Sequence, residues 1–107
     1  MIFRVLMTDD AERDLLGLYR YVALNDTPAN ALPLLAKIEK VITSLDILPN
    51  RGHYPPELER IGVQEFREVF FKPYRIIYEI TGPDVFVHCV LDGRRDLVDL
   101  LQERLLR

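Results

Sequence analysis

The sequence predicts an α+β fold: an N-terminal strand, an antiparallel helical hairpin, a three-stranded antiparallel meander and a short C-terminal helix. In the first half, apolar residues recur at helical spacing over two stretches. In the second half, three stretches rich in β-branched and aromatic residues are separated by tight turns. With 107 residues and 49% hydrophobic content, the chain can build one compact core, so we expect a single domain over residues 1–107.

The first strand is expected at Ile2–Met7, and a helix is expected to begin directly after it. An oxygen of Thr8 or Asp9 can accept from the free amides of a first helical turn. The acidic residues that follow suit the positive end of the helix dipole. Apolar residues then repeat at helical spacing up to about Leu24: Ala11, Leu15, Leu18 and Val22.

A second helix is expected after the break at Asn25–Asp26, with Thr27 as its cap and Pro28 in its first turn. The link is short, so the two helices should form an antiparallel hairpin. The apolar stripe of this helix ends at Pro49–Gly52 and comprises Ala31, Leu34, Leu35, Ile38, Val41, Ile42, Leu45 and Leu48.

An ordered loop over residues 50–64, with a turn of helix at Glu57–Arg60, should lead into the meander. The strands are expected at Glu65–Phe71, Tyr74–Thr81 and Val85–Leu91, joined by tight turns. In the middle strand, alternation separates two faces: Tyr74, Ile76, Tyr78 and Ile80 form the core face, and Arg75, Ile77 and Glu79 form a half-polar face.

The chain should end in a helix capped by Asp96, with an apolar stripe of Leu97, Leu100, Leu101 and Leu105. We expect a mainly antiparallel four-stranded sheet in which the N-terminal strand lies beside one of the other three. The hairpin should pack on one face, and the final helix near an edge or on the other face.

Composition narrows the classes of function. The net charge is −3, so any contact with nucleic acid must come from a local patch. The single cysteine, Cys89, excludes an intramolecular disulfide and fits a small buried side chain. We find no spacing typical of a metal site, no phosphate-binding glycine loop, no signal peptide and no membrane span. We therefore expect a cytoplasmic protein without a cofactor.

The main candidate for recognition is the arginine pair Arg94–Arg95, which follows Gly93 where the last strand ends. Arginine is costly to bury, and its guanidinium binds carboxylate or phosphate in a bidentate manner. A pair placed after a strand is therefore expected to project outward and bind an anion.

Further cations could extend this patch. Alternation lets Arg67 and Arg75 emerge on the same half-polar face, and Lys72 lies in the turn between them. The alternative is that they form cross-strand ion pairs, with Arg67 beside Glu68 and Arg75 beside Glu79. For Arg67 alone we favour the structural alternative, and for the Arg94–Arg95 pair we favour binding.

The two histidines are weaker candidates. His88 lies within the last strand and could act as a general acid or base, although a single strand histidine is more often packed. His53 has no partner near it in the sequence, and we assign it no role.

The order of elements, with Tyr74-Arg75-Ile76-Ile77-Tyr78 and Asp92-Gly93-Arg94-Arg95-Asp96, resembles the RelE/ParE superfamily of toxins from bacterial type II toxin–antitoxin modules. The likeness runs over nearly the whole chain. Two segments of the first helix, Ala11–Leu15 and Tyr19–Asn25, are more similar to the ParE branch, often labelled plasmid stabilisation proteins.

This resemblance implies a toxin neutralised by a cognate antitoxin, whose carboxy-terminal segment wraps the toxin and whose amino-terminal part binds operator DNA. ParE-type members poison DNA gyrase and are not enzymes. RelE-type members cut messenger RNA on the ribosome, and their arginines correspond to Arg75 and to Arg94 or Arg95. The resemblance also leads us to expect a tight heterocomplex, a heterotetramer among its forms, and a homodimer without the partner.

The sequence departs from the nuclease pattern at its end. Leu100 and Leu101 stand where several nucleases carry a tyrosine or histidine, and arginine transfers protons poorly at its high pKa. Our leading hypothesis is therefore a gyrase-directed toxin acting through Arg94, Arg95 and the terminal helix. The alternatives are a ribosome-dependent endoribonuclease that uses Arg67, Arg75, Arg94 and His88, and a non-toxic remnant that still binds antitoxin.

Overall fold

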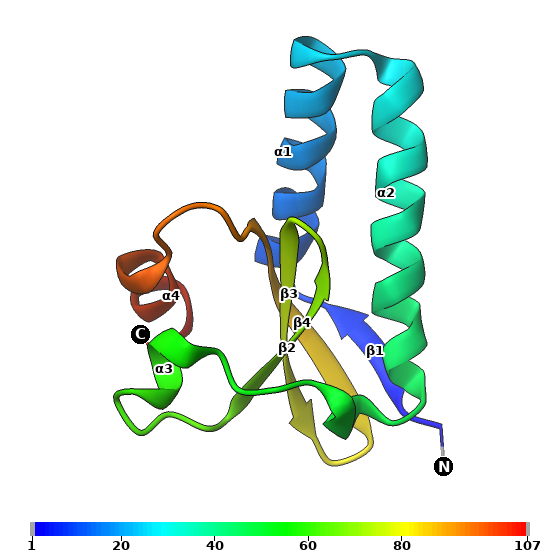
Figure 1. The fold of residues 1–107 in the computed structure, drawn as a ribbon. Helices are drawn as coiled ribbons and strands as arrows, with labels where there is room; N and C mark the ends of the chain where they lie inside the picture. The colour runs from blue at the N-terminus through cyan, green and yellow to red at the C-terminus, as the bar shows by residue number, and fades with distance from the viewer. Residues whose placement is uncertain (1, 107) are drawn as a thin grey trace.

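The computed structural model describes residues 2–106 (Figure 1). The chain runs through β1 (Arg4–Met7), α1 (Asp9–Asn25), α2 (Pro28–Thr43), the short 3-10 turns η1 (Ser44–Asp46) and η2 (Pro49–Arg51), α3 (Pro56–Glu59), β2 (Phe66–Phe71), β3 (Tyr74–Thr81), β4 (Asp84–Asp92) and α4 (Val98–Leu105). This is the element order that the sequence predicts. The second helix is shorter than expected, because α2 ends at Thr43 and the chain continues in η1 and η2, where the apolar stripe predicted a helix to about Leu48. The other helix and strand boundaries shift by two residues at most.

The four strands form one sheet in the order β1-β4-β3-β2. Strands β2, β3 and β4 form the antiparallel meander, as their tight connections require. Strand β1 pairs with β4 in parallel, with Arg4 opposite Asp84 and Met7 opposite Val87. The predicted α+β class and the position of the N-terminal strand beside a meander strand are confirmed.

The helical hairpin of α1 and α2 covers one face of this sheet (Figure 1). Thr27 is the predicted cap of α2, and its Oγ1 accepts from the amide of Asn30 at 3.1 Å. Of the two candidates for α1, Thr8 and Asp9, the cap is Thr8, whose Oγ1 accepts from the amide of Ala11 at 3.2 Å. The buried core on this face comprises Ala11, Ile38, Ile42, Leu45, Tyr74, Ile76, Tyr78, Val85, Val87 and Val90.

The opposite face carries α3 and α4, so the fold has three layers (Figure 1). Helix α4 begins at Val98, and Asp96 Oδ1 accepts from the Val98 amide at 3.1 Å. The Asp96 carboxylate therefore accepts a hydrogen bond from the first residue of the helix, although Leu97, and not Asp96, occupies the N-cap position. This second core comprises Leu58, Phe66, Ile77, Cys89, Leu91, Leu97 and Leu101.

Candidate functional site

The Arg94–Arg95 turn joins the end of β4 to α4. The Gly93 amide donates to the Pro73 carbonyl at 2.8 Å, which places this turn beside the turn between β2 and β3. A side chain at Gly93 would bring its Cβ within 2.9 Å of Cγ and Cδ of Arg75 and of the Pro73 carbonyl oxygen. Glycine is therefore needed for the turn to rest directly on the aliphatic stem of Arg75.

Arg94 is exposed but has a partner. Its Nε donates to Oδ1 of Asp92 at 3.0 Å and its Nη2 to Oδ2 at 2.7 Å. These hydrogen bonds, with one from the Arg94 amide, lower the pKa of Asp92 to about 2. The guanidinium side chain remains 68% exposed, so it can reach an external anion only in competition with Asp92.

Arg95 has no such partner. Within residues 2–106 its side chain makes neither a hydrogen bond nor an ion pair, and the residue is exposed. It borders two hollows, one beside α1 and one between α3 and α4. The outward projection expected for the pair is thus seen for both arginines. Arg95 is the one whose side chain makes no hydrogen bond or ion pair within residues 2–106, although its charge also helps to lower the pKa of Asp92.

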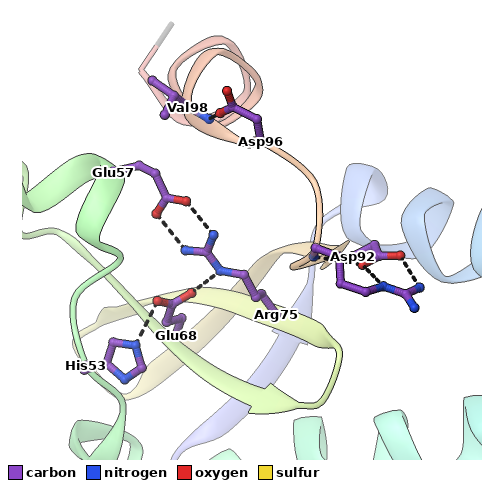
Figure 2. A network of polar contacts seen from close by, with 8 residues as sticks. His53, Glu57, Glu68, Arg75, Asp92, Asp96 and Val98 are labelled. Carbon is purple, nitrogen blue, oxygen red and sulfur yellow. Dashed lines mark hydrogen bonds and ion pairs between the residues drawn. The ribbon is translucent and has the colours of Figure 1, made fainter.

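Arg75 lies directly behind the turn and is enclosed by two glutamates (Figure 2). Its Nε donates to Glu68 Oε1 at 2.6 Å, while Nη1 and Nη2 form a fork on Glu57 at 2.5 and 2.8 Å. The side chains of Arg75 and Glu68 are 9% and 1% exposed. The hydrogen bonds that Arg75 donates to Glu57 lower the pKa of Glu57 and raise the pKa of Arg75. Arg75 is therefore neutralised inside the fold.

His53 completes this network. Its Nε2 lies 2.8 Å from Oε2 of Glu68, and the two residues also form a backbone bridge, with N···O distances of 3.2 and 2.7 Å. Sequence reasoning assigned His53 no role because its partner lies fifteen positions away along the chain. The feature of the sequence that could have indicated this contact is Glu68, a carboxylate in the middle of a strand. On the face of the sheet that α3 and α4 cover, such a group needs polar partners.

Arg67 and Arg75 do not share a face, so that expectation is wrong. The turn at Lys72–Pro73 aligns β2 and β3 so that Arg67 lies opposite Tyr78, and Phe70 opposite Arg75. Directly opposed residues point to the same side of a sheet, so Arg67 belongs to the helical-hairpin side.

The contacts of Arg67 are structural. Its Nη1 donates to the carbonyls of Asn50 and Gly52, at 3.2 and 2.8 Å, and the guanidinium carbon lies 4.8 Å from the ring centroid of Tyr54. Arg67 thus holds the loop that precedes α3 against β2. The cross-strand partner considered for it, Glu68, belongs instead to the network around Arg75.

His88 lies at a bulge in β4. Ile77 of β3 pairs with Cys89, and the next residue, Tyr78, pairs with Val87, so His88 is left without a partner residue in β3. Its Nε2 lies 3.0 Å from Oε1 of Glu79, and its ring packs edge-on against Phe66 at 5.5 Å. The proposed pair of Arg75 with Glu79 is therefore wrong, because Glu79 contacts His88.

Two other expectations concern buried groups. Tyr78, on the predicted core face of β3, is completely buried, and its hydroxyl donates to the Pro49 carbonyl. Burial raises the pKa of the Cys89 thiol to about 12, which fits a packed and unreactive side chain. Across residues 2–106 we find no cluster of metal-binding side chains. In the same part of the chain, no helix has the length and apolar character to cross a bilayer.

A four-stranded sheet with a helical hairpin on one face and an exposed arginine turn after the last strand defines a small α+β protein with the arrangement expected for the RelE/ParE-like fold. The fold is similar to that of a chain described as "Chromosomal ParDE TA system from P. aeruginosa", with a TM-score of 0.71 at 19% identity, over 83% of this chain and 94% of that one. A protein named Toxin ParE3, from Caulobacter vibrioides, is 32% identical over 101 residues, covering 94% of this chain and 97% of that protein.

Residues 5–97 match the family described as "ParE toxin of type II toxin-antitoxin system, parDE". The chain belongs to this ParE toxin family. The resemblance to the ParE branch is thereby confirmed, and membership of a type II system implies an antitoxin partner.

Proposed function

We propose that this toxin inhibits DNA gyrase through protein contacts and is neutralised when its antitoxin binds. The observation that carries the proposal is that the arginines differ in their contacts and exposure. Arg75 donates its hydrogen bonds to Glu57 and Glu68, whereas Arg95 is exposed and its side chain makes no hydrogen bond or ion pair within residues 2–106. The recognition surface is therefore the turn, and Arg75 supports it from behind.

The chemistry of the turn suits a protein–DNA target. A guanidinium stays charged at any working pH and can bind either a carboxylate or a phosphate. A gyrase–DNA complex presents both groups. Because the contact between Arg94 and Asp92 is exposed and of small energetic weight, Arg94 can exchange this internal partner for an external one.

The same geometry gives less support to RNA cleavage. That reaction needs one group to take a proton and another to give one. Each histidine contacts a glutamate, His53 with Glu68 and His88 with Glu79, and Arg75 is enclosed. Helix α4 carries leucines at positions 100 and 101, where they pack on the core. This favours the gyrase hypothesis over the nuclease hypothesis.

The antitoxin would neutralise the toxin by covering the turn and the hollows that flank it, which lie on either side of Arg95. Gyrase acts on the chromosome, so we place this protein in the cytoplasm. The heterocomplex, including a heterotetramer, and a homodimer of the free toxin remain predictions to be tested by light scattering.

The test is to incubate purified toxin with gyrase and relaxed plasmid, and in parallel with ribosomes programmed with messenger RNA. We expect loss of supercoiling and accumulation of cleaved plasmid, both reversed by the antitoxin, with the RNA intact. Cleavage of RNA on programmed ribosomes, with gyrase unaffected, would replace this proposal with the nuclease alternative. No effect in either assay would favour the non-toxic remnant.

A further inference from the structure

Strand β4 is longer than the strand beside it, so part of its edge has no neighbouring strand. Strand β4 runs over Asp84–Asp92, whereas β1 ends at Met7, opposite Val87. The last backbone bond across this edge runs from the Thr8 amide to the Val87 carbonyl, at 3.0 Å. The chain then turns away into α1, for which Thr8 is the cap. Beyond Val87, the hydrogen-bonding groups on this edge of β4 need other partners.

Two side chains supply these partners on either side of Cys89. Asp14 of α1 accepts from the Val90 amide, which lies 2.9 Å from its Oδ2. Arg104 of α4 donates through Nη2 to the His88 carbonyl at 3.0 Å. The two side chains also bind each other, because Nη1 and Nη2 of Arg104 lie 3.2 and 3.1 Å from Oδ1 and Oδ2 of Asp14. Each of these side chains is only 15% exposed.

The pattern of these bonds is that of one residue in a parallel strand. In such a ladder, a residue donates to the carbonyl before its partner residue and accepts from the amide after it. Strand β1 shows the first half of this pattern, since the Arg4 amide donates to the carbonyl of Pro83, which precedes its partner Asp84. Opposite Cys89, the guanidinium replaces the amide of the missing residue, and the carboxylate replaces its carbonyl.

The pair also joins the two outer layers of the fold. Helix α1 belongs to the hairpin on one face of the sheet, and α4 lies on the opposite face (Figure 1). Helix α4 has eight residues, too few to be stable without packing. Leu97, at its N-cap, and Leu101 are buried, but apolar contact has no preferred direction. The directional hydrogen bonds of Arg104 to the strand edge and to Asp14 therefore fix where the helix lies.

We propose that Asp14 and Arg104 form a clasp that takes the place of one strand residue on the edge of β4 and thereby positions helix α4. The Arg94–Arg95 turn leads into this helix, so the clasp also fixes one end of the turn. Asp14 and Arg104 are positioning residues, which act through α4. Only the consequence for recognition by the turn rests on the proposed function.

Cys89 is the probe of the clasp, because its fully buried side chain packs in the core between the sheet and α4. Iodoacetamide can reach the thiol only after α4 moves away, so the labelling rate of the full-length toxin measures how often the helix opens. Arg104→Met, which keeps an unbranched side chain but no donor, should raise this rate by about tenfold or more. Arg13→Met, which removes an arginine whose side chain is 75% exposed and paired with Asp10, should leave it unchanged.

Two variants at position 14 separate the strand edge from the charge. Asparagine keeps an oxygen that can accept from the Val90 amide, whereas leucine, of similar size, keeps neither the acceptor nor the charge. The rise in labelling rate should therefore be at least about threefold smaller for Asp14→Asn than for Asp14→Leu. Equal effects would mean that charge alone holds α4, and would overturn the strand-like role.

Urea separates local opening of α4 from unfolding of the whole domain. Labelling through global unfolding would rise by about fivefold or more per molar urea, because unfolding exposes a large surface. Through opening of α4 alone, it should rise by less than about twofold. Ile38→Val, which weakens the hairpin core at a fully buried position, should leave labelling without urea unchanged. A steep urea dependence in Arg104→Met, or unchanged labelling in that variant, would overturn the clasp.

The gyrase assay tests the consequence for recognition. Arg104→Met should need about threefold or more toxin for the same plasmid cleavage, whereas Ile38→Val should match the wild type because its α4 is held in place. Faster labelling with unchanged potency would overturn the positioning of the turn. If the wild-type toxin leaves gyrase unaffected, the proposed target is refuted, and the labelling rates still decide whether the clasp holds α4.

Discussion

Replacing Arg75 by methionine should destabilise the protein strongly while leaving a folded molecule with an intact recognition turn. Methionine keeps an unbranched stem next to Gly93, where an added Cβ would lie only 2.9 Å from Cγ and Cδ of Arg75, but removes the guanidinium. Glu68, whose side chain is 1% exposed, then keeps only His53 as a partner. Breaking a buried ion pair by removing one member costs about 3–5 kcal/mol. Against a domain stability of about 5–15 kcal/mol, this is a large fraction.

The matched control removes both charges. In the Arg75→Met/Glu68→Leu variant no uncompensated carboxylate remains in the core, and Glu57 can turn toward water because its side chain is already 15% exposed. Exchange of a buried ion pair for apolar side chains is often neutral or stabilising. The double variant should therefore recover most of the lost stability.

Urea unfolding followed by circular dichroism measures both variants. A loss of less than about 1 kcal/mol for Arg75→Met, the typical value of an exposed pair, would refute the view that this network is buried and structural. Equal losses in the single and double variants would refute the role assigned to Glu68.

Three further predictions concern single positions. Gly93→Ala should destabilise the fold by about 1–3 kcal/mol in the same assay, because the new Cβ would lie 2.9 Å from Arg75 and from the Pro73 carbonyl. An unchanged stability would mean that the turn is not held against Arg75. Gly17→Ala should instead raise the free energy of unfolding by about 0.5–1 kcal/mol, and a loss would reveal a structural need for glycine. The Asp92 carboxyl should titrate by NMR near pH 2 and return toward its ordinary pKa of about 3.9 in Arg94→Ala. The pKa of Asp92 is lower in the folded than in the unfolded protein, so its contribution to stability is complete above its ordinary pKa and is lost as the pH falls toward 2. If the titration of Asp92 is unchanged in Arg94→Ala, Arg94 is not the cause of the lowered pKa.

Local patterns predicted most of the fold. Helix starts depend on side chains within one turn, so Thr27 could be predicted as a cap, and Thr8 as one of two candidates with Asp9, from their neighbours alone. Strand periodicity likewise separated the two faces of β3, and the tight turns predicted the antiparallel meander. The family membership is consistent with the same elements.

The network behind the turn could not be predicted in this way. Its members, His53, Glu57, Glu68 and Arg75, come from three segments, and their contacts depend on where the loop before β2 folds back onto the sheet. Alternation within one strand also does not give the register between two strands, which is why Arg67 was placed on the wrong face. The exposure of Arg94 and Arg95 was easier to foresee, because a charged pair beside a glycine at the end of a strand has few ways to be buried.

The central claim is that the exposed turn, and not the enclosed Arg75, carries recognition. The direct measurement is the amount of plasmid cleaved by gyrase at increasing concentrations of folded toxin, for the wild type, Arg94→Ala/Arg95→Ala and a control, Lys37→Ala/Lys40→Ala, which removes two exposed charges from α2. We predict that the arginine variant loses at least about tenfold in potency, the effect of roughly 1.4 kcal/mol of binding, while the control matches the wild type. Full potency of the arginine variant would contradict the account.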